Sequence, residues 1–139
     1  KLNMSKQIKL RLYFFGIAII AGYLMWLGGV IPFTLRAQVR QALGLYFLSP
    51  SLQIEDSYTD SWGDYIFRAE VTFSENSIEF LTSGREFTKY TFTEQDFIED
   101  PELKHVTMYS WHTSDEGYAS CSLLIDDSGT QGTVKYAAD

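Results

Sequence analysis

The sequence predicts an α+β protein: a single N-terminal transmembrane helix, then a small antiparallel sheet of four to five strands with a C-terminal β-meander and one or two short helices. Three observations predict this class. Residues 12–35 carry no charge, and residues 66–73 alternate between apolar and polar side chains. Polar turn sequences also divide the last third of the chain into three short apolar stretches.

Charge is distributed very unevenly along the 139 residues. Every charged residue up to position 40 is basic, whereas eighteen acidic and only five basic residues follow, a net charge of −13. We therefore divide the chain into a basic segment (1–11), an anchor (12–35), a juxtamembrane amphipathic helix (36–48) and an acidic domain (49–139). Such a domain repels nucleic acid and anionic lipid and favours a cationic partner. Simple solubility is the alternative explanation of its charge.

The uncharged run at 12–35 is long enough to span a bilayer. As a helix its 24 residues would measure about 36 Å, against a hydrocarbon core of about 30 Å. A cleavable signal peptide has a shorter apolar core, of about 7–15 residues, so we expect an uncleaved anchor. Basic residues are more frequent before the run than after it, which predicts a cytoplasmic N-terminus and an exterior domain, periplasmic if the source is bacterial.

The segment after the anchor has two interpretations. Gly28, Gly29 and Pro32 predict a kink near the outer end of the span. Beyond it, apolar residues recur at helical spacing over 33–47 while Arg36 and Arg40 occupy another face. We interpret this as a helix at the membrane surface whose two arginines meet phospholipid head groups. The alternative is a packed helix of the domain.

The acidic domain has a strand pattern that begins at Leu52, so we expect it to fold without residues 1–48. Further strands are expected at 66–73, near 90–92, and at 105–112, 118–125 and 133–137, with short helices after Ser74 and after a capping box formed by Thr93 and Asp96. A hairpin centred on Asp115 would set Cys121 opposite Tyr109, with Tyr136 on its other side.

No catalytic, cofactor or metal site is predicted. Cys121 is the only cysteine, and a thiol nucleophile needs a histidine within hydrogen-bond reach. The expected register turns His112 to the other face and leaves His105 several residues away, so we predict a buried, inert thiol. Acidic residues in the turns, at 56–64 and 126–127, do not match an EF-hand loop; solvated carboxylates are the interpretation and a calcium site is the alternative.

Trp62 is the candidate recognition residue, because it stands in a polar run with Asp60 and Asp64. We expect a non-enzymatic, membrane-anchored, extracytoplasmic protein-binding protein; an immunity-type inhibitor of a cationic protein is one version. The layout is similar to that of many bacterial single-span accessory and immunity proteins, although no motif carries the resemblance. An accessory subunit of a membrane complex is the alternative, with Ala18 and Gly22 permitting close helix packing. A small hydrolase with an unrecognised site is the second alternative.

Overall fold

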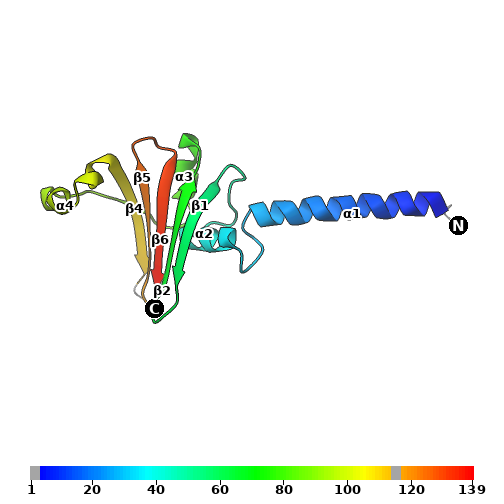
Figure 1. Ribbon diagram of the computed structural model, residues 1–139, viewed down its shortest axis with the longest axis horizontal. Coiled ribbons are helices and arrows are strands. Elements are labelled where there is room, and N and C mark those ends of the chain that lie inside the picture. The colour runs from blue at the N-terminus through cyan, green and yellow to red at the C-terminus, as the bar shows by residue number, and fades with distance from the viewer. Residues whose placement is uncertain (1–3, 114–116) are drawn as a thin grey trace.

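A long helix projects from a domain built on one antiparallel sheet (Figure 1). The computed structural model describes residues 4–113 and 117–139. The helix, α1 (Met4–Leu27), is long and apolar enough to cross a membrane, and its most apolar stretch is not buried against the domain. That exposure differs from the burial of a core helix in a soluble protein. The predicted α+β class is confirmed.

The helix α1 ends at Leu27, eight residues before the expected end of the anchor. The predicted kink is a complete break, because Gly29 adopts a φ of +71° and a Cβ atom on it would lie 2.7 Å from the carbonyl oxygen of Arg36. Only glycine tolerates both the left-handed backbone and this close approach. The apolar residues that follow therefore leave the helix and turn back towards the domain.

The sheet has six strands in the spatial order β1-β2-β6-β5-β4-β3, with every pair antiparallel. The last three long strands form the predicted meander. The pairing of β2 with β6, which joins the first hairpin to that meander, was not predicted. The strands are β1 (Gln53–Asp60), β2 (Tyr65–Thr72), β3 (Thr88–Tyr90), β4 (Val106–Thr113), β5 (Ala119–Asp126) and β6 (Gln131–Ala138).

One face of the sheet, the core face, packs on α2 (Leu35–Leu43). Thr34 caps the start of this helix through its hydroxyl, which accepts from the amide of Ala37, and Gly44 ends it in the left-handed conformation. The indole of Trp111 donates to the carbonyl of Ala42 over 3.1 Å and fixes the helix on the sheet. The buried residues that α2 and the following turn add to the core are Val39, Ala42, Leu43, Leu45 and Leu48.

This packing is the alternative considered for residues 33–47, and it moves the start of the folded unit. The core reaches back before residue 49, so the expected boundary is too late and the domain includes α2. The amphipathic pattern was identified correctly. Its apolar side meets the sheet because, over residues 4–113 and 117–139, no other helix of comparable length packs on the core face of β2, β6 and β5.

The register of the β4–β5 hairpin differs from the expected one by two residues. Cys121 pairs with Trp111 rather than Tyr109, because the strands meet with Thr113 opposite Ala119. A shift of two keeps every side chain on its face. Cys121 therefore lies on the core face as predicted, with Tyr136 on its other side.

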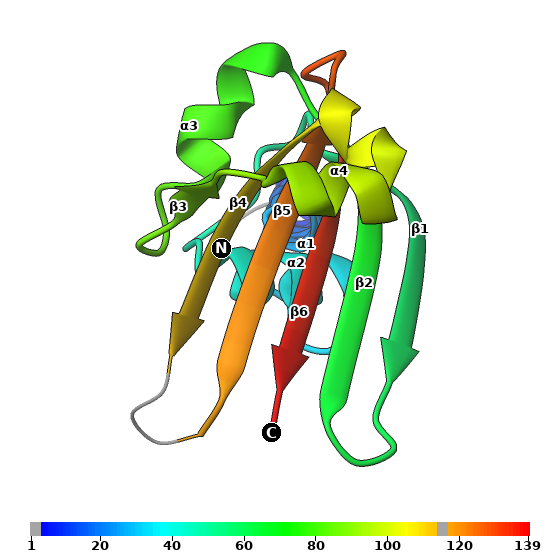
Figure 2. The same ribbon diagram turned by 90° about the vertical axis from the view of Figure 1, so that its left-hand side faces the viewer.

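The opposite face of the sheet, the outer face, is mostly uncovered (Figure 2). At one end of it stand α4 (Glu94–Glu99), begun by the predicted Thr93–Asp96 capping box, and η2 (Pro101–His105). The short pieces η1 (Glu75–Ser77) and α3 (Ile78–Leu81) follow β2, and Leu81 joins the core. Because α1 and α2 lie on the core side, the outer face points away from α1 (Figures 1 and 2).

Candidate functional site: a cleft on the outer face

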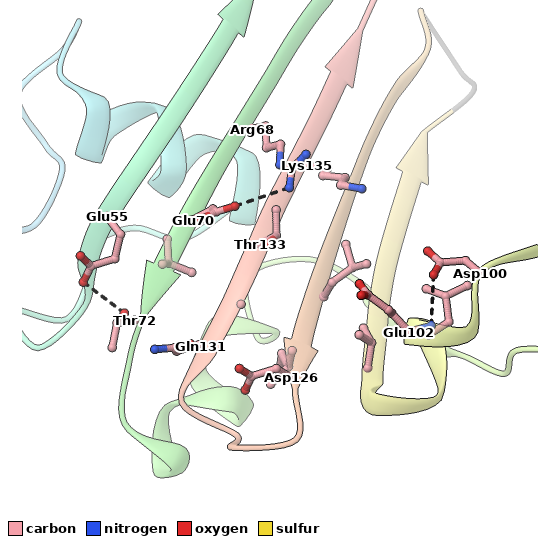
Figure 3. A pocket seen from close by; sticks show the side chains of 16 residues that line it. Glu55, Arg68, Glu70, Thr72, Asp100, Glu102, Asp126, Gln131, Thr133 and Lys135 are labelled. Carbon is pink, nitrogen blue, oxygen red and sulfur yellow. Dashed lines mark hydrogen bonds and ion pairs between the residues drawn. The ribbon is translucent and has the colours of Figure 1, made fainter. Parts of the chain in front are cut away.

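The outer face and the segment around η2 enclose a cleft of about 680 Å³ (Figure 3). Its floor comes from β2, β6 and β5, where Leu124 and Thr133 are cross-strand neighbours. Asp100 and Glu102 overhang it from one side. Side chains alternate between the two faces, so Leu124 and Lys135, the neighbours of the buried Leu123 and Val134, line the cleft.

The cleft is acidic at its edge. Five carboxylates line it, and only two cations do, so its formal charge is −3. The thiol of Cys121 is on the other face, and the cleft contains no histidine. Arrangements of this kind bind cations through ionic and hydrogen-bonding contacts. The carboxylates are those of Glu55, Glu70, Asp100, Glu102 and Asp126.

The two cations of the cleft are direct cross-strand neighbours. Arg68 of β2 is in register with Lys135 of β6, which in turn is in register with Ser122 of β5. Arg68 pairs with Glu70 at 3.5 Å, and both side chains are about half exposed. Like charges set directly opposite each other destabilise a sheet, so packing alone does not explain this pair. Together the two cations offer a small positive spot inside an acidic cleft.

The three predicted recognition residues lie together in the β1–β2 hairpin, outside the cleft. Trp62 is 95% exposed, and its backbone amide donates to the carboxylate of Asp60 over 3.0 Å. Asp64 is exposed in the same turn. An indole this exposed gains nothing from the core, and such side chains commonly anchor interfaces. The turn is at the end of the sheet opposite α4 (Figure 2).

Arg36 and Arg40 were expected to meet phospholipid head groups. Arg36 is 7% exposed, and its guanidinium donates to the carbonyls of Leu27, Ser49 and Leu52. Burial lowers the pKa of Arg36, although a guanidinium stays charged at neutral pH. These contacts argue against a head-group role for Arg36.

Arg40 is half-buried and binds the chain in a similar way. Its guanidinium donates to the carbonyl of Gly29 over 2.8 Å and to that of Leu45 over 2.9 Å. Its expected contact with lipid stays a prediction. Sequence spacing placed the two arginines on one side of α2 but gave no sign of the carbonyls around them, because those carbonyls come from the end of α1 and from loops.

Cys121 is 1% exposed on the core face. Burial raises the pKa of its thiol to about 12, so the thiol is protonated at neutral pH. His112 follows Trp111, the partner of Cys121, and therefore points to the outer face. His105 lies in η2, where its ring contacts the carboxylate of Asp127 at 2.9 Å. The structure brings neither histidine to the thiol.

The turn carboxylates serve mainly as local hydrogen-bond acceptors. Asp126 accepts from the backbone amide and the hydroxyl of Ser128, and Asp60 accepts from Trp62. Over residues 4–113 and 117–139, no three His, Cys, Asp or Glu side chains are close enough to hold a metal ion. The expectation that the protein needs no cofactor stays a prediction.

Comparisons with protein-family models, with curated proteins and with solved structures find no match to this chain. Sequence reasoning missed the cleft itself. The alternation of β2 already placed Arg68 and Glu70 away from the core, but only the unpredicted β2–β6 pairing brings them to Lys135. The overhang of Asp100 and Glu102 depends on tertiary packing that no local pattern encodes.

Proposed function

We propose that this protein is a non-enzymatic, membrane-anchored binding protein that captures a cationic segment of another protein on the outer face of its sheet. One observation carries the proposal: an acidic cleft lies on the only broad face of the sheet that α2 does not cover, among the residues described, and that face points away from α1. A partner approaching from the side away from a membrane would meet this face first.

Charge supports a basic partner. The net charge of −13 carried by the chain after residue 40 attracts a cationic protein over a distance and speeds its capture, while it repels nucleic acid. Within the cleft, the five carboxylates would meet lysine or arginine side chains. The Arg68–Lys135 pair would meet an acidic group or a backbone carbonyl, which gives the site a defined charge pattern rather than a uniform one. Inhibition of a cationic toxin, as by an immunity protein, is one use of such a site.

The position of the partner follows from the orientation of the chain. The excess of basic residues before the uncharged part of α1, which starts at Leu12, favours a cytoplasmic N-terminus, which would hold the domain outside the cytoplasm. Anchoring confines the domain to the membrane surface and raises its local concentration there. The proposed protein would thus intercept a basic partner at the outer face of the membrane.

The experiment is affinity capture with the full chain, solubilised from its native membrane in a mild detergent. We would compare the wild type with a double variant, Glu70→Gln and Glu102→Gln, which removes two cleft charges with little change in shape. Glu79→Gln is the matched control, because Glu79 is exposed on α3 and does not line the cleft. Co-purifying proteins would be identified by mass spectrometry, with salt washes of increasing strength.

We expect a basic protein to co-purify with the wild type and the control, to be lost from the double variant, and to elute with salt. Retention of the same partner by the double variant would contradict the cleft as the binding site. An acidic partner, or none in the native membrane fraction, would contradict the proposed function.

A second candidate is an accessory subunit of a membrane complex. It is favoured by the exposure of α1, whose small residues Ala18 and Gly22 lie open to a neighbouring helix. Replacing the apolar stretch of α1 by leucines separates the two candidates. Capture that survives the replacement supports binding through the domain, whereas loss of the partner supports association through the span.

A further inference from the structure

The part of α1 that carries no charge is short for a membrane span. Residues 12–27 are the uncharged portion, and sixteen helical residues measure about 24 Å. A typical hydrocarbon core is about 30 Å thick. Basic side chains at the other end of α1 can extend towards the aqueous phase and cover part of the difference. Apolar residues at the end where α1 joins the domain have to cover the rest of the hydrocarbon thickness.

An exposed apolar rim lies at that junction. The loop after α1, the first residue of α2 and the turn after α2 contribute the rim, which we define as Val30, Phe33, Leu35, Tyr46 and Phe47. Phe33 is 100% exposed and Tyr46 is 93% exposed. The two segments are held together at the end of α1, because the amide of Leu48 donates to the carbonyl of Gly28 over 2.8 Å. Residues 28–35 and 45–48 include no charged residue.

Phe33 has an unusual backbone as well as an unusual exposure. Its φ is +63°, and among the described residues it is the only one other than glycine with a positive φ. An aromatic residue in this conformation is strained, and no core contact compensates for it because the side chain is fully exposed. The strain turns a large apolar ring outwards. An apolar ring in this position is unfavourable in water and would be stabilised by an apolar environment.

The backbone carbonyl groups at the rim are hydrogen-bonded within the protein and need no water. The carbonyl groups freed by the end of α1 are those of Leu27, Gly28 and Gly29. They accept hydrogen bonds from Arg36, from the amide of Leu48 and from Arg40, respectively. Irregular backbone is tolerated at membrane depth only when its polar groups are satisfied within the protein. The two arginines and the amide of Leu48 donate those hydrogen bonds.

We propose that the rim is a lipid-seating surface. It sinks into the boundary between head groups and acyl chains in the leaflet on the domain's side, completes the span that α1 begins, and holds the sheet against the membrane with its outer face pointing away. The proposal rests on the membrane anchoring given above. A lipid surface is the occupant because the rim is uncharged, continuous with α1 and composed largely of the aromatic side chains that favour the membrane interface. Aromatic residues Tyr23 and Trp26 at the same end of α1 extend this band.

The test places a fluorescent probe on single introduced cysteines in the full chain, reconstituted in phosphatidylcholine vesicles. The three positions are Phe33→Cys in the rim, Ile19→Cys within α1, and Ile98→Cys on α4, where an exposed apolar residue lies far from α1 (Figure 1). The wild-type chain controls for Cys121, which is buried and should take up no probe. Quenchers are lipids labelled near the head group, lipids labelled deep in the acyl chain, and iodide in the aqueous phase.

We expect the deep lipid quencher to act at position 19, the shallow lipid quencher at 33, and iodide alone at 98. Quenching at 19 by lipid together with quenching at 33 by iodide alone would overturn the lipid-seating surface and leave the anchor intact. Absence of lipid quenching at 19 would instead overturn the anchor. Protection at 33 from both lipid and iodide would mean that protein covers the rim, and it would also overturn the proposal.

Discussion

The two faces of the sheet are built by the same strands yet have opposite surroundings. In β5, Leu123 is completely buried on the core face, whereas the next residue, Leu124, is half-exposed in the cleft. In β6 the same change occurs between the buried Val134 and the exposed Lys135. Alternation explains why the two faces differ. It does not explain why only one of them is covered.

The difference comes from the position of α2. This helix and the turn after it place five apolar residues on the core face, and the indole of Trp111 ties the helix to the sheet. On the outer face, α4 and η2 cover only one end (Figure 2). The core that stabilises the domain and the proposed binding surface are thus on opposite faces of one sheet. Substitutions on the core face should change folding, and those on the outer face should change binding.

The largest expected effect follows from removing the cover of the core face. Deleting residues 1–48 removes α2 and the apolar residues that it adds to the core. The loss should be comparable with the whole stability of a small domain, about 5–15 kcal/mol, so the fragment should not fold. Circular dichroism during urea titration should show no cooperative transition.

Deletion of residues 1–26 is the matched control, because it removes most of α1 but keeps α2 and the carbonyl of Leu27 that binds Arg36. In mild detergent this fragment should unfold cooperatively. If the shorter fragment that begins at residue 49 also unfolded cooperatively, α2 would be dispensable and the boundary expected from the sequence would be right.

The second prediction compares neighbouring leucines on opposite faces. Leu123→Ala should lower the free energy of unfolding by about 2–5 kcal/mol, because it leaves a cavity in a fully buried site. Leu124→Ala should lower it by less than about 1.5 kcal/mol, since Leu124 is only half-buried. Urea unfolding of the two variants in the same detergent measures both. Equal losses would mean that the outer face is also covered.

The third prediction concerns Cys121 on the core face. Cys121→Ser should lower the free energy of unfolding by about 1–3 kcal/mol at pH 8, because the buried hydroxyl would be poorly paired. Burial raises the pKa of the thiol from 9.0 to about 12. Between these values the unfolded chain has lost the proton that the folded chain keeps. The thiol's contribution to stability is therefore complete below pH 9 and falls as the pH rises towards 12.

Serine does not titrate in this range, so Cys121→Ser is the reference against which the contribution of the thiol at each pH can be measured. The difference in stability between the wild type and Cys121→Ser should shrink between pH 8 and pH 10.5, while other titrating groups affect both proteins alike. Thiol labelling of the native wild type at pH 8 should also be slow. A constant difference, or rapid labelling, would indicate that Cys121 is accessible.

Local sequence patterns correctly predicted the features that are set by residues close together in the chain. The alternation of β2, the capping box before α4 and the face of Cys121 were all predicted from residues within a few positions of one another. The end of α1 was misplaced because apolar content alone does not show that Gly29 must turn. The cleft depends on the pairing of β2 with β6, whose paired residues are 59 to 73 positions apart in the sequence, and no turn sequence specifies that pairing.

The smallest expected effect on folding is at the exposed hairpin. Trp62 is 95% exposed, so Trp62→Ser should change the free energy of unfolding by less than about 0.5 kcal/mol. If the hairpin contributes to recognition, the same variant should weaken partner capture by about 30-fold, since an anchoring tryptophan is commonly worth about 2 kcal/mol at an interface. Tyr118→Ser is the matched control, because Tyr118 is 51% exposed near the other hairpin. Unchanged capture by Trp62→Ser would confine recognition to the cleft, whereas a loss shared with Tyr118→Ser would show that the partner covers this whole end of the sheet.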